Sequence, residues 1–204
     1  MNTKAMALGL SLGITLLGLS QPVHAEENMT PPKTDKIILA GGCFWCIEAV
    51  YERIPGVVGA VSGYLGGHVE NPTYRQVCEG TTGHAEAVEI EFDPAKITLG
   101  QILDTFWHAH DPTQLNRQGN DVGTQYRSAI FYHNEDQKKV VEESIRALTE
   151  AKTYAKPIVT QVAPAGKFYV AEDYHQAYFE NNRTQSYCRF VIQPKLEKLG
   201  LEKK

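Results

Sequence analysis

Apolar residues along this chain form two kinds of pattern, short alternating runs and longer stretches with helical spacing. The clearest alternation extends from Glu86 to Phe92, where Val88, Ile90 and Phe92 share one face and charged residues dominate the other. A period of two predicts a half-buried β-strand. Glu86 has the parity of the apolar face, so its carboxyl group is predicted to point toward the core.

The same reasoning predicts the other elements, with Gly, Pro and Asn marking the turns. Strands are expected at 37–40, 57–64, 127–132 and 158–162. Helices are expected after residue 43, at 73–78, from 98 to about 111, from 134 to about 151 and at 172–180. Thr98 with Gln101 forms a capping box, and a long polar loop is expected from 113 to about 125.

This order of elements predicts an α+β fold. Strands alternate with helices as βα, then as paired strands, then as βα again. The pattern favours a two-layer α/β sandwich with a mixed sheet and a ferredoxin-like core. Residues beyond 180 show no strong pattern, so a long coil-rich C-terminal tail is expected to wrap back over the sheet.

The N-terminus has the features of a secretory signal peptide. Lys4 supplies a positive charge, Ala5 to Ser20 are almost wholly apolar, and Val23 and Ala25 are small residues at the positions that determine cleavage. The alternative is an uncleaved membrane anchor, for which the apolar run is short. We expect a signal peptide at 1–25, a flexible leader at 26–36 and a single catalytic domain at 37–204, in an exported and periplasmic protein.

Charge and composition narrow the range of partners. The net charge is −4, and acidic and basic residues are interspersed rather than grouped. This distribution indicates no nucleic-acid partner and, after cleavage, no membrane surface. Without an exposed heptad pattern the mature protein is expected to be a monomer.

Four cysteines remain in the mature chain: Cys43, Cys46, Cys78 and Cys188. In an exported protein they could form two structural disulfides. A domain of this size does not need such cross-links, and the position of Cys43 after Gly41-Gly42 favours redox chemistry. Cys78 lies among apolar neighbours of a short helix and is predicted to be a packed, inert thiol.

Cys43 is the candidate nucleophile because it follows an apolar strand and precedes a helical pattern. At a helix N-terminus, unpaired N–H groups and the helix dipole favour a thiolate over a thiol. Cys46 lies one helical turn further on, within reach of a disulfide bond. Phe44 and Trp45 could hold the methyl group of a substrate through apolar and sulfur–aromatic contact. The alternative for Trp45 is packing in the core at the first turn of the helix.

Five motifs resemble those of the A-type peptide-methionine (S)-S-oxide reductases and span about 37–194. They are Gly42-Cys43-Phe44-Trp45-Cys46, Asn71-Pro72-Thr73-Tyr74, Thr82-Gly83-His84-Ala85-Glu86, Gly119-Asn120-Asp121-Val122-Gly123-Thr124-Gln125-Tyr126-Arg127 and Glu172-Asp173-Tyr174-His175-Gln176. The resemblance implies reduction of methionine-S-sulfoxide in oxidised proteins and peptides, with electrons drawn from a thioredoxin-like donor. It implies neither a cofactor nor a metal.

The resemblance also implies roles for polar residues. Tyr74 and Tyr126 would donate phenolic hydrogen bonds to the sulfoxide oxygen, and Asp121 would organise the polar network of the pocket. A sulfoxide sulfur is a poor electrophile until its oxygen is protonated or hydrogen-bonded. Glu86, desolvated on the apolar face of its strand, is the candidate acid.

The reaction leaves a sulfenic acid on Cys43, which a second thiol must resolve before further oxidation. Cys46 is expected one helical turn from Cys43, and Cys188 lies in a segment expected to be flexible enough to reach the site. Many members of the resembled family have glycine at the position of Cys46 and use C-terminal cysteines instead. We therefore expect a first disulfide between Cys43 and Cys46, with Cys188 passing it outward or forming an alternative bond.

Two other classes of protein use closely spaced thiols. A thioredoxin-like thiol-disulfide oxidoreductase would explain Cys43 and Cys46 but would leave Glu86, Tyr74 and Tyr126 without a role. A zinc module would need two further ligands from Cys188, His84 or His175, and no second pair has suitable spacing.

Overall fold

The computed structural model describes Met1 and residues 33–202, so the expected signal peptide and most of the expected leader lie outside the described residues. The strands are β1 (Asp35–Gly41), β2 (Val57–Leu65), β3 (Ala85–Phe92), β4 (Arg117–Gln118), β5 (Asp121–Val122), β6 (Ser128–Tyr132), β7 (Gln161–Pro164) and β8 (Tyr169–Val170). The α-helices are α1 (Phe44–Tyr51), α2 (Tyr74–Cys78), α3 (Leu99–Ala109), α4 (Glu135–Glu150), α5 (Tyr178–Asn181) and α6 (Gln193–Lys198). β1 begins two residues inside the segment 26–36 that was expected to be flexible.

Six strands form one sheet in the order β7-β6-β1-β3-β2-β8. Its four central strands, β6-β1-β3-β2, are antiparallel neighbours, and α1 and α3 connect β1 to β2 and β3 to β6. This is the ferredoxin-like arrangement that the order of elements predicted. β7 pairs with β6 in parallel, which makes the sheet mixed. The predicted fold class is confirmed.

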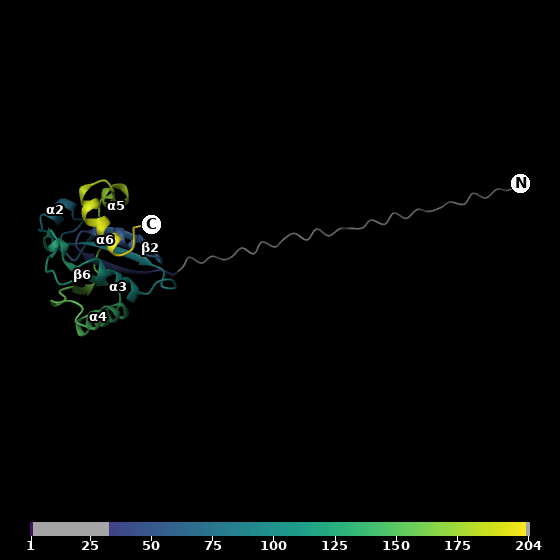
Figure 1. Ribbon diagram of the computed structural model, residues 1–204. Helices are drawn as coiled ribbons and strands as arrows, with labels where there is room; N and C mark the ends of the chain where they lie inside the picture. Colours follow the sequence, from purple (N-terminus) through teal and green to yellow (C-terminus); the bar gives the residue numbers. More distant parts are fainter. Residues whose placement is uncertain (2–32, 203–204) are drawn as a thin grey trace. The chain divides into compact units, whose positions relative to one another are not determined.

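The core is divided by the sheet. On one face, residues from β1, β3 and β6 are buried with α1, α3 and α6, including Tyr51, Phe106 and Leu196. The opposite face carries a smaller cluster covered by Ala163, Ala165 and Phe168. In Figure 1 the C-terminal helices α5 and α6 lie together, and α3 lies beside α4. No helix in the described part of the chain is long and apolar enough to span a bilayer.

The core contains no methionine. All three methionines of the chain precede residue 30, so the buried apolar side chains of residues 33–202 are aliphatic, aromatic or cysteine. Side-chain caps fix the starts of α2, α3 and α4. The cap of α3 is the predicted box of Thr98 with Gln101. Asn134 similarly accepts a bond from the backbone N–H of Gln137 at the start of α4.

Three predicted segments differ from the structure. The expected loop at 113–125 contains the hairpin β4–β5 and a 3₁₀ turn, η1 (Thr124–Tyr126), because the segment folds on itself across Gly119. The strand expected at 158–162 begins only at Gln161. The helix expected at 172–180 is divided into a 3₁₀ turn, η2 (Asp173–His175), and α5, because Ala177 adopts a left-handed conformation with φ of 48°.

The end of the chain is helical, so the expectation of coil there was wrong. A π-helical turn, η3 (Cys188–Ile192), leads directly into α6. Cys188, Ile192 and Leu196 are all buried, with exposures of 0–1%. This spacing of four places them on one face, and burial of that face against α1 stabilises a helix that the local sequence specifies weakly.

Candidate active site

Cys43 lies where the central strand β1 turns into α1. Gly42 makes the turn with φ of +95°, and a Cβ there would lie 2.7 Å from the Cβ of Gln118, so only glycine fits. Cys43 is the residue at which α1 starts, and it is 7% exposed. The predicted placement of this thiol at a helix N-terminus is confirmed.

A second thiol and a tyrosine accompany Cys43. Cys46 is on the first turn of α1, and its Sγ lies 3.7 Å from the hydroxyl of Tyr187. All four cysteines are free thiols in this structure. A cavity of about 520 Å³ reaches both Cys43 and Cys46, between the β4–β5 turn and the η3–α6 segment.

Burial raises the pKa of the Cys43 thiol well above its usual value, and the nearby Glu86 carboxylate adds to this. In this resting arrangement burial therefore opposes the stabilisation that the helix N-terminus was expected to give a Cys43 thiolate, and that expectation stays a prediction. The first amide of α1, that of Phe44, donates to Glu86 Oε2 instead, at 3.1 Å. The hydrogen bond from Cys43 lowers the pKa of Cys46.

Glu86 is buried beneath this turn, as its position in the strand predicted. It is 1% exposed on the central strand β3, opposite Tyr64 of β2. Burial raises the pKa of Glu86 to about 8, although the bond from the Phe44 N–H opposes the shift. The carboxyl group is therefore largely protonated at neutral pH, beside the Cys43 thiol.

Tyr74 and Tyr126 lie near enough to Glu86 for its charge to act on both phenols. Burial raises the pKa of both phenols well above the usual value, and the charge of Glu86 raises both further. Both hydroxyls remain protonated donors at every physiological pH. The structure thus brings Cys43, Glu86, Tyr74 and Tyr126 near one another, from the start of α1, β3, α2 and η1.

Phe44 and Trp45 belong to an aromatic cluster. The Phe44 ring lies 6.3 Å from that of Tyr74 and nearly parallel to it. Trp45 stacks on Tyr178 at 3.7 Å, and its indole N–H donates to His175 Nδ1 at 3.0 Å. One face of Trp45 is therefore covered. Contact of Phe44 and Trp45 with a substrate methyl group stays a prediction.

Glu48 of α1 helps to hold this cluster in place. Its carboxyl is 1% exposed and accepts hydrogen bonds from the backbone of Ala177 and Tyr178. Burial raises the pKa of Glu48 to about 7. Because Ala177 and Tyr178 begin α5, this buried carboxyl fixes the ring that stacks on Trp45.

Two residues of the site were not given roles by the sequence reasoning. Tyr187 donates to Asp121 Oδ2 at 2.6 Å, which joins the C-terminal segment to the β4–β5 turn over Cys46. Glu172 accepts from the Tyr64 hydroxyl at 2.8 Å and from the backbone N–H of Tyr74 at 2.9 Å. Glu172 opens one of the five motifs, which was the available signal, whereas nothing in the sequence singled out Tyr187.

The other cysteines have contrasting environments. Cys188 is fully buried. Burial raises the pKa of the Cys188 thiol, and the charge of Cys46 raises it further. Cys78 is exposed at the end of α2, so the prediction that it is a packed thiol was wrong. Its helix has only five residues and buries Val77 alone, leaving the neighbouring position at the surface.

The two histidines considered as zinc ligands, His84 and His175, form hydrogen bonds with other groups of the protein. His84 accepts from the backbone N–H of Gly67 and donates to the carbonyl of Val69, at 3.0 and 2.8 Å. His175 accepts from Trp45. Among the residues that the structure describes, no three His, Cys, Asp or Glu side chains are grouped as a metal site.

Comparison with known proteins identifies the family of this chain. The family model described as peptide methionine sulfoxide reductase matches residues 35–204. The chain belongs to this family. A peptide methionine sulfoxide reductase MsrA of Leptospira borgpetersenii is 56% identical over 164 residues, which are 80% of this chain and 92% of that protein.

Solved structures of peptide methionine sulfoxide reductases agree. Reduced Mxr1 from Saccharomyces cerevisiae has a TM-score of 0.72 and 35% identity, over 76% of this chain and 90% of that one. Mxr1 in complex with Trx2 has a TM-score of 0.52 and 26% identity, over 72% and 85% of the two chains. The thioredoxin-like oxidoreductase considered as an alternative is therefore not the family of this chain.

Proposed function

We propose that this protein reduces methionine-S-sulfoxide, in oxidised proteins and peptides and as the free amino acid, by transferring the sulfoxide oxygen to Cys43. The observation that carries the proposal is a buried nucleophile beside a carboxyl group held protonated, with two protonated tyrosine hydroxyls near the same carboxyl group. Membership of the peptide methionine sulfoxide reductase family supports the same reaction.

The first step needs an acid and a thiolate together. Glu86 donates its proton to the sulfoxide oxygen while Tyr74 and Tyr126 hydrogen-bond to that oxygen, which makes the sulfur electrophilic. Cys43 passes its proton to Glu86, with which it is hydrogen-bonded, as Glu86 gives its own proton to the oxygen, and the Cys43 thiolate forms a bond to the sulfur. The hydroxyl then moves from that sulfur to Cys43 Sγ as the S–O bond and the new S–S bond break, so methionine leaves and Cys43 becomes a sulfenic acid.

The second step forms a disulfide. The Cys46 thiol condenses with the Cys43 sulfenic acid, and one molecule of water leaves. Cys46 is one helical turn away and already contacts Cys43, whereas Cys188 is buried behind it. A dithiol donor then supplies two electrons and two protons. The yeast relative in complex with Trx2 supports a thioredoxin-like donor.

Turnover of the two sulfoxide epimers tests the proposed function. With purified mature protein and excess dithiothreitol, we expect the S epimer of a blocked methionine sulfoxide to be consumed and the R epimer to remain. Chromatography of the methionine product measures both. Reduction of insulin disulfides without consumption of either epimer would instead indicate a thiol-disulfide exchanger.

The order of disulfide formation gives a second prediction. After one equivalent of sulfoxide and no reductant, peptide mapping should find Cys43 joined to Cys46. In Cys46→Ser, one methionine should still form per enzyme, but the Cys43 sulfenic acid should persist and react with dimedone. The matched variant Cys188→Ser should form the disulfide as the unaltered protein does. A map of the unaltered protein with Cys43 joined only to Cys188 would refute this order.

Export is also proposed, on the pattern of residues 1–25. An exported enzyme needs an electron donor in the same compartment, so the donor would be a periplasmic thioredoxin-like protein. We propose a monomer because the chain lacks an exposed heptad pattern. Cell fractionation with detection of the mature N-terminus, and light scattering of the purified protein, test these two points.

A further inference from the structure

The cavity that reaches the two thiols does not touch the predicted substrate-binding residues. It is lined by Cys43, Cys46, Asp121, Tyr187, Phe190 and Val191, among others, and by none of Phe44, Trp45, Tyr74 or Tyr126. The thiol pair is thus reached through an opening that the aromatic cluster does not line. A protein that must reach the Cys46 sulfur, rather than the aromatic cluster, meets this opening.

The rim of this opening is apolar and unusually exposed. Phe190 is 74% exposed and Val191 is 38% exposed, on the turn that follows Cys188. Large apolar side chains exposed beside a reactive group are typical of a protein-docking site. Phe190 could be buried by a partner without any change in the enzyme.

Basic residues flank the apolar rim. Arg189 lies over the Phe190 ring at 5.8 Å, and Lys195 and Lys198 follow on α6. The hydrogen bond from Cys43 lowers the pKa of Cys46 most, and the positive charge of Lys195 lowers it further. Glu197 is the acidic residue of the same helix, and Gln193 donates to it. Asp121 lines this opening, and Asp111 lines the groove beside it. The exposed Arg189 and Lys198 therefore suit local pairing with acidic side chains of a partner rather than a broad positive field.

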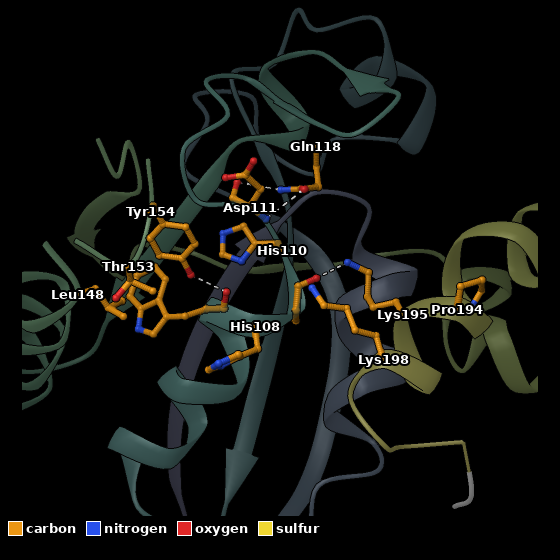
Figure 2. A pocket seen from close by; sticks show the side chains of 12 residues that line it. His108, His110, Asp111, Gln118, Leu148, Thr153, Tyr154, Pro194, Lys195 and Lys198 are labelled. Atoms are coloured by element: carbon orange, nitrogen blue, oxygen red, sulfur yellow. Dashed lines mark hydrogen bonds between the residues drawn. The ribbon is translucent and has the colours of Figure 1, made fainter. Parts of the chain in front are cut away.

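An adjoining groove of about 590 Å³ extends the same surface. It shares Gln118 and Lys195 with the thiol cavity and lies between α6, α3 and the end of α4. Figure 2 shows Lys195 and Lys198 reaching from α6 toward it, with Lys195 bonded to the carbonyl of Ala109. Lys198 is exposed at its edge, so its charge is available to a partner.

We propose that this surface, formed by Phe190, Val191, Arg189, Lys195 and Lys198, docks the thioredoxin-like electron donor, and that Phe190 is its apolar anchor. The proposal rests on the proposed function. The donor thiolate attacks Cys46 Sγ of the disulfide, and Cys43 leaves as a thiolate. The second donor thiol then attacks the mixed disulfide, which releases Cys46 and oxidises the donor. Substrate and donor would thus approach one thiol pair past different residues.

Steady-state kinetics with two reductants test this surface. Turnover of the S-sulfoxide is measured with thioredoxin, thioredoxin reductase and NADPH, and separately with dithiothreitol, which needs no docking surface. For Phe190→Ala we expect kcat/KM for thioredoxin to fall about tenfold, as for an interface anchor. Lys198→Glu should lower it about threefold at low salt, with a smaller effect at high salt. Dithiothreitol turnover and the KM for sulfoxide should not change.

Matched variants elsewhere serve as controls. Val170→Ala removes an apolar side chain that is 64% exposed on β8, and Lys139→Glu reverses an exposed charge on α4. Both should leave thioredoxin kinetics unchanged. Unaltered thioredoxin kinetics in Phe190→Ala would overturn the proposal, as would an equal loss with both reductants or a raised KM for sulfoxide. Failure of the proposed function is distinct, because the unaltered protein would then fail with dithiothreitol also.

Discussion

Cys43→Ser is expected to abolish reduction of methionine-S-sulfoxide, with a loss of at least about a thousandfold, the scale on which removal of a covalent nucleophile acts. A hydroxyl in the same place is far less nucleophilic than a thiolate and does not accept the sulfoxide oxygen. Because the first step itself fails, not even one methionine should form per enzyme. Rapid quench of the dithiol enzyme with one equivalent of sulfoxide measures this.

A matched cysteine serves as the control. Cys78→Ser removes a thiol at the exposed end of α2 and should keep full turnover. Circular dichroism of both variants checks that each is folded, since Cys43 is buried and its replacement could disturb the start of α1. A Cys43→Ser protein that still formed one methionine per enzyme would place the nucleophile elsewhere.

Glu86→Gln is expected to lower the rate of the first step by about a hundredfold to a thousandfold, as for loss of a general acid. Glutamine can still donate a hydrogen bond but cannot transfer a proton. In the unaltered enzyme the rate should fall as the pH rises through about 8, where Glu86 loses its proton. Glu86→Gln should lack this fall, which separates an acid from a residue that merely packs.

Stability gives an independent readout for Glu86. Its pKa in the folded state lies above the usual 4.5, so the folded state binds the proton more tightly than the unfolded state. Stability from this group is therefore full at low pH and declines as the pH rises from about 4.5 to about 8. Glu86→Gln should remove this decline in the free energy of unfolding, measured with urea.

The kinetic test can exclude Glu86 as the acid. It would do so if the rate of Glu86→Gln still fell as the pH rises through about 8.

The sheet and the position of the nucleophile could be predicted from the sequence. Alternation at Glu86–Phe92 and the apolar run before Gly42 are local signals that correspond directly to the central strands β3 and β1. Glycine at 42 marked the turn that a positive φ requires. The burial of Glu86 followed from side-chain parity together with the Gly83-His84-Ala85-Glu86 motif, because parity alone would also allow a glutamate at the start of a strand to turn outward.

The C-terminal segment could not be predicted because contacts distant in sequence determine it. η3 and α6 are short, and the burial of Cys188, Ile192 and Leu196 against the rest of the domain stabilises them. The bond from Tyr187 to Asp121 joins residues 66 positions apart. The raised pKa of Cys43 could not be predicted for a similar reason, since the burial and the Glu86 carboxylate that raise it come from elements distant in the sequence.

The absence of methionine from residues 33–202 bears on how long such an enzyme survives in use. Oxidants that create its substrates also attack methionine side chains in the repair machinery itself, and a sulfoxide in a core turns an apolar side chain polar. A domain whose interior contains none offers those oxidants no such target. Met29 of the expected mature chain precedes this domain, so methionine oxidation does not damage the core that holds the active site.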